Sequence, residues 1–247
     1  MGRAVLESAR GMGELRVVST IDRPDAAGLG AGLGEGVVAA ADIEAGLAAC
    51  DVYIDFTAPA ATRAIAEAAA RHRRAAVIGT TGLGPADEAA VEALARVAPL
   101  VFAANFSLGV NLVLGLVRQA ARALPEWDAE VVEAHHRAKR DAPSGTALMI
   151  ARAIAAGHGV DYDSVKRHAR DGDVGPRPRG EIGVSSVRGG DVVGEHTAYF
   201  FGSAERLEIS HRATSRAIFA AGALRAAAWV AGQPPGRYDM LDVLGLQ

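Results

Sequence analysis

The stretch "CDVYIDFTAPAATRAIAEAAARHRRAAVIGTTG", Cys50–Gly82, decides how the first half of this chain folds. Two short apolar segments, Cys50–Thr57 and Ala75–Gly82, flank an alanine-rich segment, Pro59–Arg73, which begins with the proline favoured in a first helical turn. Two strands joined by a helix run parallel in one sheet. The apolar residues of both strands are nearly continuous, which is typical of strands covered on both faces.

The same alternation extends in both directions along the chain. Glu14–Asp22 and Pro99–Ser107 are predicted as further strands, and Pro85–Arg96 as a second helix. The predicted fold class is therefore α/β, with a Rossmann-like, doubly wound parallel sheet. Ligands of such sheets bind beyond the carboxyl ends of the strands, and each predicted strand here ends in polar or glycine-rich residues.

The second half of the chain follows a different pattern. We expect a smaller α+β domain with a mostly antiparallel sheet, followed by a long helix over Ser215–Ala231. The expected elements are a strand at Asp128–His136, a helix at Ser144–Ala156, a Gly- and Pro-rich loop at Arg170–Glu181, and strands within Glu181–Gly189, Val192–Gly202 and Glu205–Ala213.

The composition narrows the class of protein. A chain of 247 residues with 50% hydrophobic residues can bury a substantial core, and its net charge of −3 gives no sign of a nucleic-acid partner. The single cysteine, Cys50, rules out a disulfide framework. We find neither a run long and apolar enough for a membrane span nor a secretory signal pattern. These features predict a cytoplasmic enzyme that acts on a small molecule.

The stretch "EAHHRAKRDAPSGTAL", Glu133–Leu148, gathers the groups that can carry chemistry. His135 and His136 are neighbours at a strand end, so their side chains point to opposite faces and we expect no shared metal ion. One imidazole can then act as general acid or base while the other binds an anion. The alternative is a structural pair that hydrogen-bonds to backbone carbonyls. Lys139, one of only two lysines in the chain, favours the catalytic interpretation because an amine can give up a proton.

A predicted anion-binding helix start follows in the same stretch. Ser144 is placed as the N-cap, with Gly145 and Thr146 in the first turn of the helix. The unpaired amides of a first turn bind carboxylates. Glycine weakens a helix, so its presence at 145 is explained by a ligand that must approach the backbone closely.

These residues resemble a known family. "EAHHRAKRDAPSGTAL" resembles the signature of the dihydrodipicolinate reductases, which are nicotinamide-dependent enzymes of the diaminopimelate route to lysine. Five further blocks resemble that family in its order: "VIGTTG", "FAANFSLGVN", "RGGDVVGEHTAYF", "ERLEISHRATSRAIFAAGALRAA" and "YDMLDVL". The resemblance implies a dinucleotide-binding domain over residues 1–106 with 215–247, a substrate-binding and oligomerisation domain over 107–214, and a homotetramer.

The resemblance also implies a reaction and its residues. 4-Hydroxy-tetrahydrodipicolinate, a dicarboxylate, would be reduced with loss of water, with NADH or NADPH as cofactor. By position, His135 would be the proton donor or acceptor and Lys139 the proton donor, while His136, Gly145 and Thr146 would hold a carboxylate. The cofactor residues implied are Asp22 for the ribose, Arg23 for the extra phosphate of NADP, and Gly79, Thr80, Thr81, Ala103, Ala104, Asn105 and Phe106 around the nicotinamide. Arg188, His211 and Arg212 are further candidates for the second carboxylate, whereas Glu195 and His196 are equally explained as structural residues of the sheet.

The N-terminus departs from the family pattern. "MGRAVLESARG" matches the end of the family's glycine-rich turn and the helix after it, so the first strand and most of the phosphate loop are absent. Losing about five buried side chains at ~1.5–3 kcal/mol each forfeits much of a domain's stability. We therefore expect Met1 to be an internal methionine of a longer protein, or else a slot between neighbouring strands and weakened dinucleotide binding.

Two alternative functions remain open from the sequence. The first is a substrate-binding or regulatory relic of this family that transfers no hydride, because the phosphate loop is missing. The second is a semialdehyde dehydrogenase of similar architecture, which would need a nucleophilic cysteine. Cys50 lies at a strand start in the first half of the chain, which disfavours that role.

Overall fold

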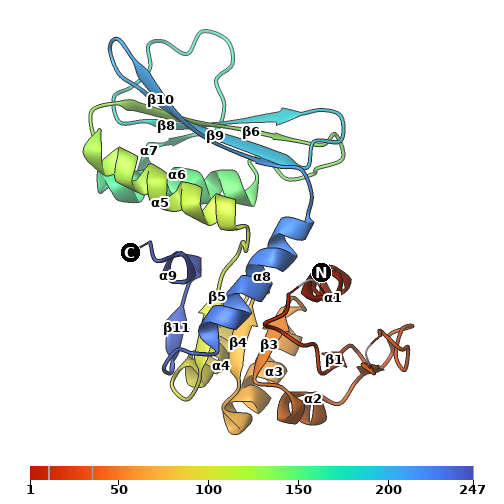
Figure 1. Cartoon of the computed structure of the whole chain (residues 1–247). Coiled ribbons are helices and arrows are strands. Elements are labelled where there is room, and N and C mark those ends of the chain that lie inside the picture. Colours follow the sequence, from red (N-terminus) through yellow and green to blue (C-terminus); the bar gives the residue numbers. More distant parts are fainter. Residues whose placement is uncertain (11, 35, 247) are drawn as a thin grey trace. The chain divides into compact units, whose positions relative to one another are not determined.

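A computed structural model describes residues 1–10, 12–34 and 36–246. The chain forms two compact units, one made of Met1–Ser107 with Ala217–Gly245 and the other of Leu108–Arg216. Gly11, Glu35 and Gln247 fall within the expected domain ranges but lie outside the described residues. Figure 1 shows the helices and strands of each unit.

A four-stranded parallel sheet forms the centre of the first unit. Its strand order is β11-β5-β4-β3. The central strand β4 is buried at every position, as its continuous apolar sequence predicts. These strands are β3 (Val52–Asp55), β4 (Ala75–Ile78), β5 (Pro99–Phe102) and β11 (Gly236–Tyr238). The α/β, Rossmann-like class predicted for this half is confirmed.

Helices cover both faces of this sheet. Ala76, Ile78 and Leu100 share a core cluster with α3 and α4, whereas α8 packs against β3, β4 and β5 from the other face. The helix α1 packs on α8, and α2 packs on α3. The bounds are α1 (Gly2–Ala9), α2 (Ile43–Ala49), α3 (Pro59–His72), α4 (Pro85–Ala95), α8 (Ala217–Val230) and α9 (Met240–Leu244).

The predicted strand Glu14–Asp22 is largely wrong. Only β1 (Thr20–Ile21) is a strand, and it pairs in parallel with β2 (Ala39–Ala40) in a separate two-stranded sheet. Within the described residues, no backbone hydrogen bonds join β1 to β3, so Leu15–Ser19 has no neighbouring strand to complete a ladder. A cavity of about 190 Å³ lies beside this segment, lined by Leu6, Leu15, Val17, Val37 and other residues.

The second unit contains a five-stranded mixed sheet with the order β10-β9-β6-β8-β7. The expected smaller α+β domain is confirmed. Its sheet is mixed: β9 pairs antiparallel with both β6 and β10, as expected, whereas β8 pairs parallel with both β6 and β7. Arg170–Glu181 has no regular structure, as predicted. The strands are β6 (Asp128–His135), β7 (Lys166–Arg167), β8 (Ile182–Arg188), β9 (Gly194–Phe201) and β10 (Arg206–Ala213).

Two helices pack on one face of this sheet (Figure 1). They are α5 (Leu108–Ala123) and α6 (Gly145–His158), with the short α7 (Tyr162–Val165) after them. The two helices lie very close together at Gly157, where an added Cβ would come within 2.6 Å of the Ala121 Cβ. Val131, Val184, Ala198 and Phe200 bring the strands into the same core. None of the helices in the described residues is long and apolar enough to cross a membrane.

Candidate active site

The strand β6 carries two ionisable residues on its buried face. Its side chains alternate between buried and half-buried, and Glu133 and His135 take the last two buried positions after Ala129 and Val131. Glu133 is 0% exposed and His135 is 9% exposed. The buried face of β6 is therefore apolar at Ala129 and Val131 and ionisable at Glu133 and His135, which places a polar site at the end of the strand.

Several hydrogen bonds surround the Glu133 carboxylate. Oε2 accepts from Arg188 Nη1 at 2.7 Å and pairs with His135 Nδ1 at 2.6 Å, while Oε1 accepts from Arg188 Nη2 at 2.8 Å and from the Ser144 amide at 3.1 Å. Burial alone would raise the pKa of Glu133, but hydrogen bonds from Arg188, His135 and Ser186 outweigh it and lower the pKa to about 2. Glu133 is therefore an anion at neutral pH.

His196 of β9 forms the second wall of the site. Its ring lies 5.1 Å from the His135 ring at an interplanar angle of 75°, and its Nε2 lies 3.0 Å from Ser144 Oγ. Burial, with a smaller contribution from His135, lowers the pKa of His196 to about 4, so the imidazole is neutral at neutral pH. His196 is 4% exposed, which agrees with a structural role.

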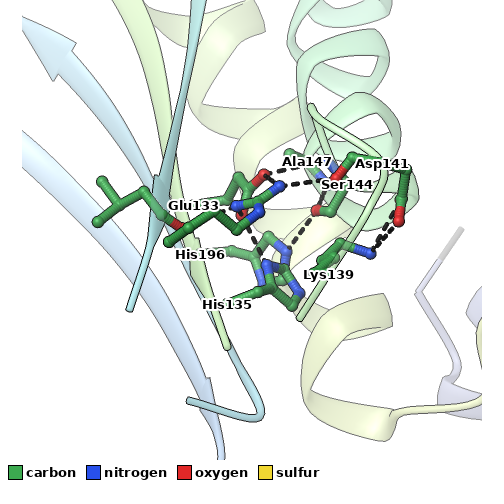
Figure 2. A network of polar contacts seen from close by, with 9 residues as sticks. Glu133, His135, Lys139, Asp141, Ser144, Ala147 and His196 are labelled. Atoms are coloured by element: carbon green, nitrogen blue, oxygen red, sulfur yellow. Dashed lines mark hydrogen bonds and ion pairs between the residues drawn. The ribbon is translucent and has the colours of Figure 1, made fainter. Parts of the chain in front are cut away.

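Lys139 follows β6 in a turn and points its amine at a carboxylate. Figure 2 shows the Nζ directed toward Asp141 rather than toward the His135 ring, and both Asp141 oxygens lie at 2.9 Å. The Lys139 side chain is 19% exposed and that of Asp141 is 64% exposed. Hydrogen bonding from Lys139 lowers the pKa of Asp141. The amine is thus held at the surface by one exposed partner.

The start of α6 has the predicted geometry. Ser144 is the N-cap, and its Oγ accepts a hydrogen bond from the Ala147 amide at 3.1 Å. Gly145 is exposed, and an added Cβ there would meet nothing within 4 Å, so the chain itself does not require glycine at this position. Thr146 and His136 are half-buried. The His136 amide donates to the Val192 carbonyl at 2.7 Å, so its backbone fixes the turn after β6.

The carboxyl ends of β3, β4 and β5 form a second set of polar residues, in the first unit. At Gly79, an added Cβ would come within 2.2 Å of the Phe56 ring and 3.0 Å of the Phe106 ring. Only glycine fits between these rings, which are 5.4 Å apart and edge to face. Thr80 is buried, and its Oγ1 accepts the Thr57 amide at 3.1 Å. This edge of the sheet is therefore closely packed, with the Gly79 backbone against two aromatic side chains.

The other expected cofactor residues fall into two places. Thr81 is exposed after β4, and Ala103, Ala104 and Asn105 follow β5 at the same edge of the sheet. The Asn105 side chain caps this turn by accepting the Ser107 amide at 2.8 Å. Asp22 and Arg23 follow β1 instead, in the separate two-stranded sheet, where both are exposed. Asp22 Oδ1 accepts the Arg23 amide at 2.8 Å.

Two of the candidate arginines for the second carboxylate have partners within the chain. Arg188 binds Glu133 with both terminal nitrogens and also donates to the Asp141 carbonyl at 2.8 Å. Arg212 pairs with Glu195 at 3.4 Å. Glu133 itself was overlooked, although its spacing of two from His135 places both on one face of the strand.

Two further observations bear on the alternatives. Burial raises the pKa of the half-buried Cys50 thiol, which opposes a role as nucleophile. Across residues 1–10, 12–34 and 36–246, no group of three or more His, Cys, Asp or Glu side chains is arranged to hold a metal ion.

Both halves of the chain match the same family of known proteins. Residues 1–106 match the family model for the dihydrodipicolinate reductase N-terminus, and residues 109–244 match the model for its C-terminus. The 4-hydroxy-tetrahydrodipicolinate reductase of Alkalilimnicola ehrlichii is 50% identical over 100% of this chain and 95% of its own length. That of Dinoroseobacter shibae is 49% identical, over 100% of this chain and 94% of its own length.

Solved structures agree in fold. A dipicolinate-bound dihydrodipicolinate reductase from Paenisporosarcina superposes with a TM-score of 0.80 at 24% identity, covering 98% of this chain and 94% of its own. A probable dehydrogenase from Thermotoga maritima superposes with a TM-score of 0.64 at 10% identity, covering 98% of this chain and 89% of its own. Together with the two full-length relatives, these matches show that the chain belongs to the dihydrodipicolinate reductase family.

Proposed function

We propose that this chain reduces 4-hydroxy-tetrahydrodipicolinate to tetrahydrodipicolinate, with loss of water and oxidation of NADH or NADPH, in the diaminopimelate route to lysine. The observation that carries the proposal is the identity of about half of all residues to reductases of that name along the whole chain. A nicotinamide supplies the hydride when bound. The chain must supply a proton, neutralise two carboxylates and hold both molecules.

The second unit, which corresponds to the substrate domain expected over residues 107–214, is proposed to bind the substrate. His135 exchanges a proton with the ring, and Lys139 donates a proton after its amine leaves the exposed Asp141. His136 and the amides of Gly145 and Thr146 bind one carboxylate at the start of α6. The open space over Gly145 supports this assignment, because a ligand oxygen can approach the backbone there.

The first unit, which corresponds to the domain expected over residues 1–106 with 215–247, is proposed to bind the dinucleotide. The cradle at Gly79, a backbone turn packed against the Phe56 and Phe106 rings, is proposed to line the nicotinamide. Asp22 is proposed to bind the ribose hydroxyls, and Arg23 beside it the extra phosphate of NADP. The other proposed contacts are Thr80, Thr81, Ala103, Ala104, Asn105 and Phe106.

The assay follows nicotinamide absorbance with the enzymatically generated substrate, using NADH and NADPH in parallel. Lys139→Ala is expected to lower kcat at least about tenfold, which corresponds to losing one proton transfer of modest efficiency. Lys166→Ala is the matched control, since Lys166 is the other lysine and pairs with Asp163 at 2.5 Å on the surface. Unchanged turnover in the Lys139 variant would remove Lys139 from the mechanism.

The same assay separates the reductase from the relic that binds substrate without hydride transfer. A relic would show no cofactor oxidation in the wild-type chain and no saturable NADH binding by nicotinamide fluorescence. The full-length identity to reductases disfavours that alternative.

We further propose that the protein is a cytoplasmic homotetramer that assembles through the sheet face of the second unit opposite α5 and α6. Val187 and Phe201 are 51% and 37% exposed, and the register places Val187 beside Ala134 on that face. Tyr199 stacks on Phe201 there, with ring centroids 5.7 Å apart. Val187→Glu is expected to shift the sedimenting species from tetramer to smaller forms. A wild-type chain that sediments as a monomer would contradict the proposal.

A further inference from the structure

The buried carboxylate of Glu133 has more partners than the packing of a strand requires. It lies two residues before His135 on the same face of β6, and it is completely buried. Each of its oxygens accepts a hydrogen bond from Arg188, and the His135 ring, the Ser144 amide and Ser186 are further partners of the carboxylate. A buried ion is tolerated when it is paired and hydrogen-bonded in this way.

We propose that Glu133, held by Arg188, is a positioning residue that keeps a proton on His135 Nδ1 and stabilises the imidazolium, so that Nε2 is the nitrogen that exchanges a proton with the substrate. The inference rests on the proposed function, in which His135 is the proton donor or acceptor. Glu133 and Arg188 would thus contribute to the reaction through His135, without touching the substrate themselves.

The tautomer follows from the protonation state of Glu133. With its pKa lowered to about 2, the carboxylate can only accept hydrogen bonds. At 2.6 Å from Glu133 Oε2, His135 Nδ1 must therefore be the donor. This leaves Nε2 as the ring nitrogen that is not committed to Glu133, in the arrangement by which a carboxylate orients a catalytic imidazole.

The orientation of the ring follows from its other neighbours. Gly194 of β9 leaves room for the imidazole, since an added Cβ would come within 3.0 Å of His135 Nε2. The His196 ring packs edge to face against it. Arg188 fixes the carboxylate in two places and holds the Asp141 carbonyl, so the turn that carries Lys139 is tied to the same guanidinium.

The charges around His135 come from four elements. Glu133 is on β6, Arg188 on β8, His196 on β9, and Lys139 on the turn after β6. His196 is neutral near neutral pH because burial lowers its pKa to about 4. Glu133 is therefore the negative charge that hydrogen-bonds the ring, opposite the nearby cations Arg188 and Lys139.

Glu133→Gln is the first test, with Glu130→Gln as its matched control. Glu130 lies on the same strand and also binds two arginines, Arg170 and Arg177, but its side chain is on the opposite face. We expect Glu133→Gln to lower kcat about tenfold to a hundredfold, the loss equivalent to one charged hydrogen bond, with a smaller change in KM. The alkaline limb of the kcat profile is expected to move to lower pH, and Glu130→Gln to leave rate and profile unchanged.

A double variant, Glu133→Gln with Arg188→Met, separates positioning from folding. If the single variant is slow only because Arg188 lost its partner, the double variant regains stability and rate together. If Glu133 acts on His135, the double variant folds but stays slow, with the shifted pH profile. Recovery of the wild-type rate in the double variant would overturn the inference.

Ring ¹⁵N spectra of the wild-type protein give an independent readout. Neutral His135, assigned by comparison with His135→Gln, is expected to carry its proton on Nδ1, and a proton on Nε2 would also overturn the inference. Failure of the proposed function looks different, because the wild-type chain would then oxidise neither NADH nor NADPH with the substrate. A wild-type enzyme that is active and loses activity with His135→Gln, but not with Glu133→Gln, contradicts only the inference.

Discussion

Ser144→Ala removes one oxygen that serves two partners. The Ser144 Oγ accepts the Ala147 amide at 3.1 Å, which caps α6, and it lies 3.0 Å from His196 Nε2. Ser144 is 2% exposed and His196 is 4% exposed, so water has little access to either group. In the described residues His196 Nδ1 already has no hydrogen-bond partner. The substitution would therefore leave both ring nitrogens and one helix amide unpaired.

The expected loss of stability combines two effects. Removing an N-cap side chain lowers the free energy of unfolding by about 0.5–2 kcal/mol. Leaving a buried polar atom unpaired lowers it by about 1–3 kcal/mol. Because both effects occur in one substitution, we expect a total of about 2–4 kcal/mol, a large part of the ~5–15 kcal/mol typical of a whole protein.

Urea denaturation of the purified protein measures this loss. Asp161→Ala is the matched control, because Asp161 caps α7 of the same unit through the Ser164 amide at 3.1 Å but is exposed. An exposed cap is expected to contribute about 1 kcal/mol or less. If Ser144→Ala loses no more than Asp161→Ala, the claim that His196 depends on Ser144 is refuted.

Two further predictions concern protonation and packing. Burial lowers the pKa of His196 from 6.5 to about 4, so as the pH falls the imidazole is protonated in the unfolded chain before it is protonated in the folded one. The stability that the buried, neutral His196 contributes is therefore complete above about pH 6.5 and is lost as the pH falls toward 4. Denaturation at pH 7 and pH 5 should show a smaller pH dependence in His196→Asn than in the wild type, and an equal one would contradict the assignment. Gly79→Ala places a methyl group against the Phe56 ring, so we expect a loss of about 1–3 kcal/mol in stability together with weaker NADH binding by fluorescence titration. Unchanged affinity would show that the cradle at Gly79 does not contact the cofactor.

The elements predicted correctly are those that local sequence specifies. Pro59–Arg73 and Pro85–Arg96 match α3 and α4 to within one residue at each end, because proline marks the start of each helix. The strand Glu14–Asp22 failed for a non-local reason. Its composition suits a strand, but a strand also needs a neighbour to accept its hydrogen bonds, and most of this segment has none in the described residues.

In the candidate site, too, the features specified by neighbouring residues were predicted, whereas those that depend on strand pairing were not. Ser144 was identified as an N-cap from the residues beside it, and the structure confirms it. The partner of Glu133 was not identified, because Arg188 lies 55 residues further along the chain and arrives only through the parallel pairing of β6 with β8. His196 reaches Ser144 across 52 residues through the antiparallel pairing of β6 with β9. Strand order within a sheet is not readable from periodicity.

Among the described residues, each unit has a buried carboxylate at or near the end of a strand, Asp55 in the first and Glu133 in the second. Their hydrogen-bond partners indicate that Asp55 is structural and that Glu133 affects proton transfer. Asp55 ends β3, and its partners in the described part of the chain are neutral donors, among them the Thr57 amide at 2.8 Å and the Thr62 hydroxyl at 2.6 Å. Such a carboxylate fixes the backbone of the turns that follow the strands. Glu133 instead meets a guanidinium and an imidazole, both of which respond to its charge. A carboxylate that touches a titratable ring controls where a proton resides, and for this reason Glu133, rather than Asp55, should affect the pH dependence of the reaction.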